Sequence, residues 1–577
     1  MSSTRLLIER DVDATMRDGT VLRANIYRPE VSERLPVLLL RTPYNKNGGT
    51  DFCLRAAARG YVVVAQDTRG RYASDGEFMP FLDDLQDGYD TVQWAAELPS
   101  SNGDVAMWGG SYGGWTQWAA ASQNPPALKT LVPLVTFTDI YRDLLYPGGA
   151  LSLGVALTWC LGAEAGARMG RLEMTDDESA ALRAAFLEAI DQTTVRQRFE
   201  RLPLLDDPLL GREDLAPGYV RMLRERHIAD WKAGALLDQA AEASIPALHA
   251  GGWYDLFASS TTGSFAALQK RSATHQGREG QRLIMGPWAH GPVTSTVGDA
   301  EFGVRSSGLF LDLEETTLQW FDHWLKGKSF DWLKEPPVRL FVMGENRWRH
   351  EESWPLARAV ETPYYLASEG NANSLHGDGR LASKAADAAP PDRFTYDPGD
   401  PVPTHGGGLC CWAPALPPGA YDQRKVEERQ DVLVYTSEPL QEELEVTGPV
   451  RVILWASTSA VDTDWTAKLV DVGPCGYARN LCDGIVRARF RDPMQPGLVN
   501  PGDVIRYEIA LGPTSNLFLP GHAIRMEISS SNFPRFDRNL NTGQDSAISA
   551  EMVTAKQTVY HDAERRSCVL LPVVPRT

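Results

Sequence analysis

A glycine-flanked serine is the strongest chemical signal in the sequence. The stretch Met107-Trp-Gly-Gly-Ser-Tyr-Gly-Gly114 contains Gly109-x-Ser111-x-Gly113, directly after a predicted strand and directly before a predicted helix. Glycines at these positions let the chain turn tightly enough to expose the serine hydroxyl above a sheet, as in a nucleophile elbow. A phosphate-cradling loop or a plain tight turn is the alternative, but no Walker lysine follows. Ser111 is therefore the predicted nucleophile.

A serine nucleophile needs a base and an acid, and both are predicted at strand ends. His290 follows the predicted strand 281–285, where a loop can project an imidazole over the sheet edge. Asp255 follows the preceding predicted strand, 245–250. The order Ser111, Asp255, His290 along the chain is that expected of α/β-hydrolases. His249 lies in an apolar strand and is expected in the core. Asp67 is predicted to be structural, paired with Arg69 or Arg71.

An oxyanion intermediate requires two donors. The backbone amide of Tyr112, the residue after the nucleophile, is the first candidate. The Tyr44 hydroxyl, in the loop after strand 35–41, is the second, although packing at a strand end explains Tyr44 equally well.

The elements that must position these residues alternate between strand and helix. A hairpin turn is expected at 17–19, and short apolar runs predict buried strands of a mostly parallel sheet, at 35–41, 61–66, 104–108, 128–136, 245–250, 281–285 and 338–343. Helices are predicted at 52–59, 87–98, 113–122 and 309–325. From about 148 to 240 strand signals vanish, which indicates a helical insertion that could cover the site as a lid. Within it, a capping box at Thr175 and Glu178 begins a helix predicted at 179–190. Beyond about 358, short β segments between turns indicate a β-sandwich or jelly roll.

The predicted architecture is thus α/β, with an interrupted core and a β domain. Its divisions are expected at 1–146 for the first part of the core, 147–240 for the helical cap, 241–355 for the second part of the core and 356–577 for the jelly roll.

Length and composition limit the function classes. A chain of 577 residues is expected to form two or three domains. The formal charge of −18 disfavours nucleic acid as a partner. No apolar run approaches the roughly 20 residues of a membrane span, and residues 1–15 do not resemble a signal peptide, so a cytoplasmic protein, or a mature form already trimmed, is expected. The seven scattered cysteines predict a reduced protein without metal.

Several further motifs, taken together, resemble one family. These are Arg41-Thr-Pro-Tyr44, Gln66-Asp-Thr-Arg-Gly70, Ser74-Asp-Gly-Glu77, Gly110-Ser-Tyr112, Gly252-Trp-Tyr-Asp255, Gly286-Pro-Trp-Ala-His290, Val461-Asp-Thr-Asp464, Leu481-Cys-Asp-Gly-Ile-Val-Arg487 and Ser529-Ser-Ser-Asn-Phe-Pro534. The chain resembles the family of bacterial cocaine esterase, α-amino-acid ester hydrolases and X-prolyl dipeptidyl aminopeptidases over nearly its whole length. Among these, the cocaine esterase branch is most similar, because the chain begins directly at the hydrolase strands.

The resemblance implies an α/β-hydrolase core with a helical cap and a C-terminal jelly roll. It also implies that Tyr44 donates to the oxyanion and that Trp159 and Phe257 pack against the acyl group. Cys410 and Cys411 stand where the cocaine esterase branch has a leucine and a phenylalanine, so an altered acyl pocket is expected.

The sequence therefore predicts a serine esterase that cleaves small-molecule acyl or aromatic esters through an acyl-enzyme, without a cofactor. X-prolyl dipeptidase or amidase activity with the same triad is the alternative, and it would need a carboxylate to anchor the substrate amine. A non-catalytic carbohydrate-binding protein is an alternative of another class. A homodimer is compatible with the sequence.

Overall fold

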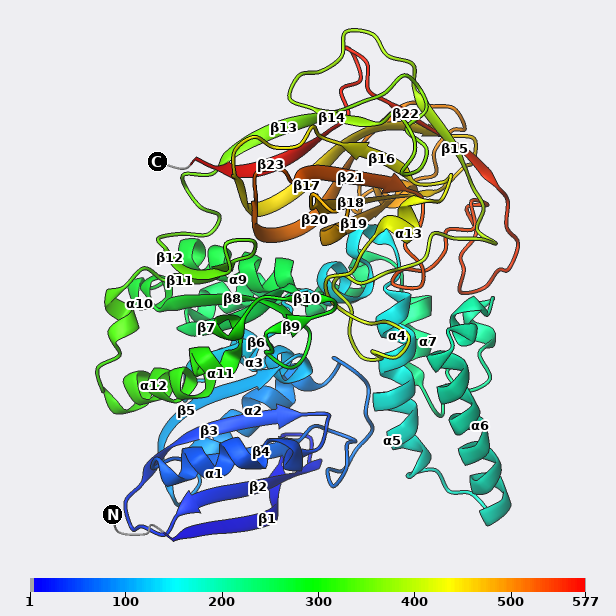
Figure 1. Cartoon of the computed structure of the whole chain (residues 1–577). Helices are drawn as coiled ribbons and strands as arrows, with labels where there is room; N and C mark the ends of the chain where they lie inside the picture. The colour runs from blue at the N-terminus through cyan, green and yellow to red at the C-terminus, as the bar shows by residue number, and fades with distance from the viewer. Residues whose placement is uncertain (1–4, 576–577) are drawn as a thin grey trace.

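The computed structural model describes residues 5–575, and Figure 1 shows their arrangement. A sheet covered by helices forms the lower left part of the view, a group of helices lies at the right, and the C-terminal strands lie above both. Residues 1–4 lie outside the described range. They belong to the N-terminal segment 1–15, which we expect not to be a signal peptide.

The core is a ten-stranded sheet in the order β1-β2-β4-β3-β5-β6-β7-β8-β11-β12. Its central strands are parallel: β3 (Leu35–Thr42), β4 (Val62–Asp67), β5 (Ser101–Gly110), β6 (Leu128–Leu134), β7 (Ala247–Tyr254), β8 (Gln281–Ala289) and β11 (Val338–Val342). The antiparallel strands at the edges are β1 (Leu6–Thr15), β2 (Val21–Pro29) and β12 (Arg347–Glu351). Each predicted core strand is present, and the predicted turn at 17–19 joins β1 to β2.

Helices cover both faces of this sheet, which explains why its strands are continuous apolar runs. On one face, α2 (Asp84–Ala96), α3 (Tyr112–Ser122) and α9 (Ala258–Arg271) pack in a common core, and α1 (Thr50–Ala58) and α12 (Leu313–Lys326) cover the other face. The single helix predicted at 309–325 is wrong in one respect. Asp312 adopts a positive φ of 49° and caps α12 with its side chain, so a short α11 (Gly308–Leu311) precedes a separate helix.

The chain between β6 and β7 forms helices, with α4 (Leu153–Trp159), α5 (Gly166–Met169), α6 (Asp176–Thr194), α7 (Pro217–Arg224) and α8 (Leu237–Ala243) as its α-helical parts. The predicted capping box is confirmed, since Thr175 and Glu178 exchange both side-chain to backbone hydrogen bonds at the start of α6. A helical insertion after β6 is placed to overhang the carboxyl ends of the core strands.

The C-terminal part is a β-sandwich whose strands form a second sheet, largely antiparallel. Its strands are β13 (Val360–Ala367), β14 (Arg380–Ala382), β15 (Asp392–Tyr396), β16 (Leu433–Thr436), β17 (Leu444–Thr458), β18 (Asp464–Val472), β19 (Ala478–Arg487), β20 (Ile505–Phe518), β21 (Ala523–Ser529), β22 (Ala555–Tyr560) and β23 (Cys568–Val574). Apolar side chains from these strands share one core with residues of β7, β8 and β11. The predicted fold class, an α/β-hydrolase core followed by a β domain, is confirmed.

Candidate active site

Ser111 stands at the sharp turn between β5 and α3. It has φ 57° and ψ −122°, an unfavourable backbone region for a residue with a side chain. Gly109, at φ 143°, is strained by any side chain, because a Cβ there would lie 2.9 Å from Leu40 Cδ1 and 3.0 Å from the Gly113 carbonyl oxygen. The turn therefore directs the serine hydroxyl away from the sheet, as the glycine pattern predicts.

His290 joins the serine to a carboxylate. Its Nε2 lies 3.1 Å from Ser111 Oγ, and its Nδ1 lies 3.1 Å from Asp255 Oδ2. The Asp255 side chain is fully buried, and the backbone N–H of Phe257 donates to its Oδ1 at 2.7 Å. A buried carboxylate that accepts the Nδ1 proton leaves Nε2 unprotonated and facing the hydroxyl. The three side chains, far apart in sequence, have the geometry of a catalytic triad.

Tyr112 is the first residue of α3, where a backbone N–H has no partner within the helix. The tip of its side chain is fixed by two hydrogen bonds: the hydroxyl donates to Asp84 Oδ2 at 2.6 Å and accepts from the Phe81 amide at 2.8 Å. Burial, together with the Asp84 carboxylate, raises the pKa of Tyr112 well above its ordinary value. The helix start is thereby fixed, with an amide available next to Ser111.

The Tyr44 phenol lines the same pocket as Ser111 and Tyr112. The Trp159 indole N–H donates to its oxygen at 2.9 Å. An indole can only donate, so the phenol proton stays free to be donated to another acceptor. Desolvation raises the pKa of Tyr44, and hydrogen bonds with Trp159 and Ser111 offset part of this effect, so the phenol keeps its proton at neutral pH. The contacts fit the oxyanion role better than simple packing at a strand end.

A narrow pocket of about 30 Å³ adjoins the serine, and we call it the acyl pocket. All four residues predicted to contact substrate, Trp159, Phe257, Cys410 and Cys411, line it together with Ser111, Tyr44 and Tyr112. The Trp159 and Tyr112 rings stack with centroids 6.0 Å apart and an interplanar angle of 4°. Leu144 and Leu145 also line it, and sequence reasoning did not identify the remaining lining residues, which are Phe81, Phe137, Val155, Ala156 and Met222.

The expectation of a fully reduced protein is wrong for one pair of cysteines. Cys410 and Cys411 are joined by a disulfide between neighbouring residues. The remaining cysteines are free, and of these only Cys475 is exposed. Cysteine counting did not reveal this pair, because pairing between adjacent residues has no loop length to recognise.

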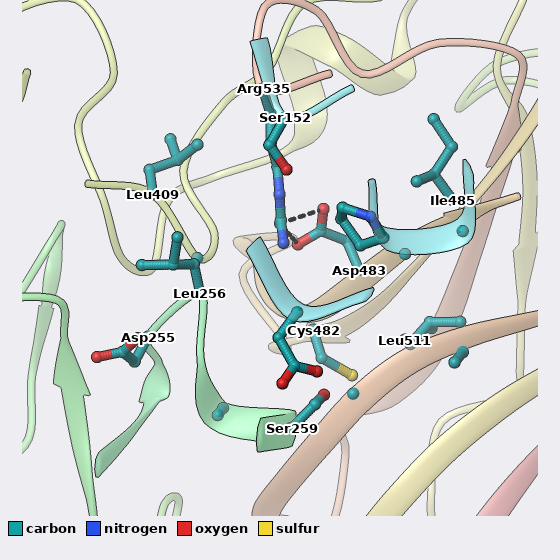
Figure 2. A pocket seen from close by; sticks show the side chains of 18 of the residues that line it. Ser152, Asp255, Leu256, Ser259, Leu409, Cys482, Asp483, Ile485, Leu511 and Arg535 are labelled. Carbon is teal, nitrogen blue, oxygen red and sulfur yellow. Dashed lines mark hydrogen bonds and ion pairs between the residues drawn. The ribbon is translucent and has the colours of Figure 1, made fainter. Parts of the chain in front are cut away.

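A larger cavity of about 310 Å³ lies behind the acyl pocket. Figure 2 shows Asp255 and Leu256 at one side of this cavity and the Arg535–Asp483 ion pair at the other. Arg535 Nη1 lies 2.6 Å from both Asp483 carboxylate oxygens. Cys410 and Val155 line both cavities, so they form part of the wall between them.

Other candidate residues have structural roles. Asp67 binds the Lys46 ammonium at 2.6 Å and the Lys46 amide at 2.8 Å, so the predicted pairing with Arg69 or Arg71 is wrong. His249 is a core residue as predicted; burial lowers its pKa to about 4, so it is neutral. Sequence reasoning did not single out a second serine, histidine and aspartate group, in which Ser368 and Asp392 contact His561. Its side chains are almost entirely buried in the β-sandwich, where a substrate cannot reach them.

Within residues 5–575, no group of three or more histidine, cysteine, aspartate or glutamate residues could hold a metal ion. No helix in that range is long and apolar enough to cross a membrane.

A serine, histidine and aspartate constellation at the carboxyl ends of the strands of this sheet defines a serine hydrolase of the α/β-hydrolase fold. Residues 18–292 match the family model of the X-Pro dipeptidyl-peptidases (S15 family), and residues 331–570 match the model of their C-terminal non-catalytic domain. The chain is 38% identical to cocaine esterase from Rhodococcus sp. (strain MB1 Bresler), over 99% of both chains. This chain belongs to the X-Pro dipeptidyl-peptidase (S15) family of serine hydrolases, and it is similar to cocaine esterase along its whole length.

Solved structures agree with this assignment. An aminopeptidase from the marine sediment archaeon Thaumarchaeota archaeon superposes with a TM-score of 0.80 at 26% identity. An α-amino acid ester hydrolase superposes with a TM-score of 0.77, also at 26% identity. In both comparisons, 99% of this chain and 97% of the other are covered.

Proposed function

We propose that this protein is an esterase that hydrolyses carboxylic esters through an acyl-enzyme on Ser111. The observation that carries the proposal is the position of His290, which contacts both Ser111 Oγ and the buried Asp255 carboxylate. A neutral imidazole at this distance can remove the hydroxyl proton as the oxygen attacks.

The reaction proceeds in two steps. Ser111 Oγ attacks the ester carbonyl while His290 takes its proton, and the Tyr44 hydroxyl and the Tyr112 amide stabilise the oxyanion. His290 then returns the proton to the leaving alcohol, and the acyl group stays on the serine. Water, activated by His290, hydrolyses the acyl-enzyme by the same steps in reverse order.

The lining of the acyl pocket supports an uncharged acyl group. Among the described residues that line it, aromatic, aliphatic and sulfur-bearing side chains predominate and no carboxylate is present. An N-terminal dipeptide or an α-amino acid ester would bring an ammonium group there, without a partner for its charge. Ester hydrolysis is therefore better supported than X-prolyl dipeptidase activity, although relatives of both kinds share the fold.

The test compares turnover of p-nitrophenyl acetate with that of an X-Pro p-nitroanilide, using the wild type and Ser111→Ala. We expect the acetate to be hydrolysed with a kcat/KM at least about 100-fold above that for the anilide, and Ser111→Ala to lose several orders of magnitude in kcat. Preference for the anilide would favour the peptidase. Unchanged turnover in the alanine variant would remove Ser111 from the mechanism.

The natural ester substrate of this protein stays a prediction. We make no prediction about hydrolysis of cocaine itself, because Cys410 and Cys411 line the pocket where the cocaine esterase branch has bulkier residues. The cytoplasmic location and a homodimer also stay predictions.

A further inference from the structure

The Cys410–Cys411 disulfide lies where it can control access to the acyl pocket. Both residues line that pocket with Ser111, and Cys410 also lines the 310 Å³ cavity behind it. Leu409, on the same loop, lies at the edge of this second cavity in Figure 2. The bonded pair therefore forms part of the partition between the acyl pocket, which Ser111 lines, and the 310 Å³ cavity, which Ser111 does not line.

The two cysteines differ in how far each residue is exposed. Cys411 is exposed, whereas Cys410 is 5% exposed and lies among the side chains of the pocket wall. We therefore expect a thiolate from solvent to attack the Cys411 sulfur, with the Cys410 sulfur as leaving group. Exchange at a disulfide depends on this kind of access as well as on thiol pKa.

The neighbouring loop is anchored on both sides of the pair. Upstream, Gly407 exchanges two backbone hydrogen bonds with Gly419, at 2.7 and 2.9 Å. Downstream, the Trp412 indole donates to Thr194 at the end of α6, and Arg196 donates to the Ala415 carbonyl oxygen at 2.7 Å. Any rearrangement on opening the disulfide is therefore confined to a few residues, and these are the residues of the pocket wall.

The bond also holds an unfavourable backbone conformation. Cys411 has φ 74°, in the left-handed region that residues with a side chain seldom adopt. The disulfide closes a ring that includes the peptide bond between the two cysteines, and this ring restricts the Cys411 backbone. Without the bond, the residue is free to return to a favourable region and the partition loses its fixed shape.

We propose that Cys410–Cys411 is a reversible modification site for small dithiols, whose opening joins the acyl pocket to the cavity behind it and admits larger acyl groups. One thiolate of the dithiol attacks Cys411 Sγ, and Cys410 leaves as a thiolate that takes up a proton. The second thiol of the reagent then displaces Cys411. The products are two cysteine thiols and the cyclic disulfide of the reagent, so two electrons and two protons pass from the reagent to the protein.

This inference rests on the proposed esterase function for its activity readout, but its chemistry is measured separately. The protein is treated with dithiothreitol, desalted without oxygen and analysed by intact mass and by alkylation of peptides. We expect a gain of two hydrogen masses, and new labelling of Cys410 and Cys411 only after reduction. Labelling of both residues before reduction, in protein kept in air, would overturn the disulfide.

The activity measurement compares p-nitrophenyl benzoate with p-nitrophenyl acetate, with Ser111→Ala as the blank for residual thiolysis. Reduction is expected to raise the benzoate-to-acetate ratio of kcat/KM about tenfold, and reoxidation to restore it. Cys410→Ser and Cys411→Ser should have the high ratio with or without the reductant, while the matched control Cys475→Ser should respond as the wild type does. An unchanged ratio in fully reduced, active enzyme would overturn the proposal and leave the esterase intact. Absence of ester turnover in every form would instead contradict the proposed function.

Discussion

At the scale of single residues, the site depends on donors whose orientation is fixed by neighbours that do not react. The Trp159 indole N–H donates a hydrogen bond to the Tyr44 oxygen, and the Tyr112 hydroxyl donates one to Asp84. The first contact orients the Tyr44 hydroxyl before a substrate binds. The second holds the Tyr112 side chain and thereby the start of α3, which supplies the Tyr112 amide. Because a preorganised donor costs no rearrangement during the reaction, it stabilises an oxyanion more than a mobile donor does.

Tyr44→Phe removes one oxyanion donor and keeps the ring. We expect kcat/KM for p-nitrophenyl acetate to fall roughly 100-fold to 1,000-fold, with most of the loss in kcat. Trp159→Phe, which leaves the phenol in place but without its fixed orientation, should lose less. Steady-state kinetics of the two variants measures both effects, and a Tyr44→Phe variant with wild-type kcat would exclude the phenol from the oxyanion site.

The sequence predicted that Ser111, Asp255 and His290 meet, because each follows a strand end that local pattern can identify. Tyr44 was different, since its residues alone left packing open and only the family resemblance indicated a donor. The partner of Asp67 was predicted wrongly, because Lys46 lies in a loop without periodic pattern. Phe81, Phe137 and Met222 carry no local signal at all; only the folded chain brings them to the acyl pocket.

At the scale of elements, the helical insertion contains a buried carboxylate that links two of its parts. Glu164 lies in the helical turn Cys160–Ala165 and accepts hydrogen bonds from the amides of Gly218 and Tyr219 at the start of α7. Burial raises its pKa from 4.5 to about 7, while these bonds and Cys160 act in the opposite direction. The ionised form is therefore less favourable in the folded protein than in the unfolded chain.

This shift makes stability depend on pH. Below about pH 4.5 the residue is protonated in both states and contributes nothing; between 4.5 and 7 only the unfolded chain loses the proton, so the folded state is destabilised as pH rises. At pH 8 the cost is at most about 3 kcal/mol. We expect Glu164→Gln to melt above the wild type at pH 8 and close to it at pH 5, as measured by thermal unfolding. A difference in Tm that does not change with pH would contradict this.

Element boundaries were predictable where pattern and capping agreed, as for α6 with Thr175 and Glu178. The predicted helix at 309–325 was wrong at one residue, because Asp312 uses a positive φ and caps the following helix. Helical periodicity continues across such a break, so the sequence pattern does not reveal it.

At the scale of the whole molecule, a buried charge network connects the β-sandwich to the helical insertion. Arg487 pairs with Asp464 and Asp537, both at 2.8 Å, and Asp537 also accepts the Leu151 amide at 2.9 Å, just before α4. Burial penalises the Arg487 charge, but the two carboxylates raise its pKa well above the ordinary value. The network therefore fixes the start of the helix that carries Trp159.

Asp537→Asn removes one buried negative charge from this network. We expect the free energy of unfolding to fall by about 3 kcal/mol, because the remaining charges stay buried with fewer partners. The control Asp331→Asn breaks an exposed pair with Lys334 and should leave stability unchanged. Denaturant titration distinguishes the two variants; equal stability would show that the buried network contributes little.

The order of strands and helices predicted both the fold class and the insertion after β6. It did not predict how the β-sandwich contacts the core, because those contacts join residues several hundred positions apart. The larger cavity depends on this packing, and no pattern in the sequence indicates it or the disulfide beside it.

The most direct test of the central claim is to locate the residue that a fluorophosphonate ester modifies. Peptide mapping of the wild type should place a single phosphonyl group on Ser111, with labelling lost in Ser111→Ala and greatly slowed in His290→Ala. A phosphonyl group on another residue, or labelling of Ser111 at the wild-type rate without His290, would contradict the account.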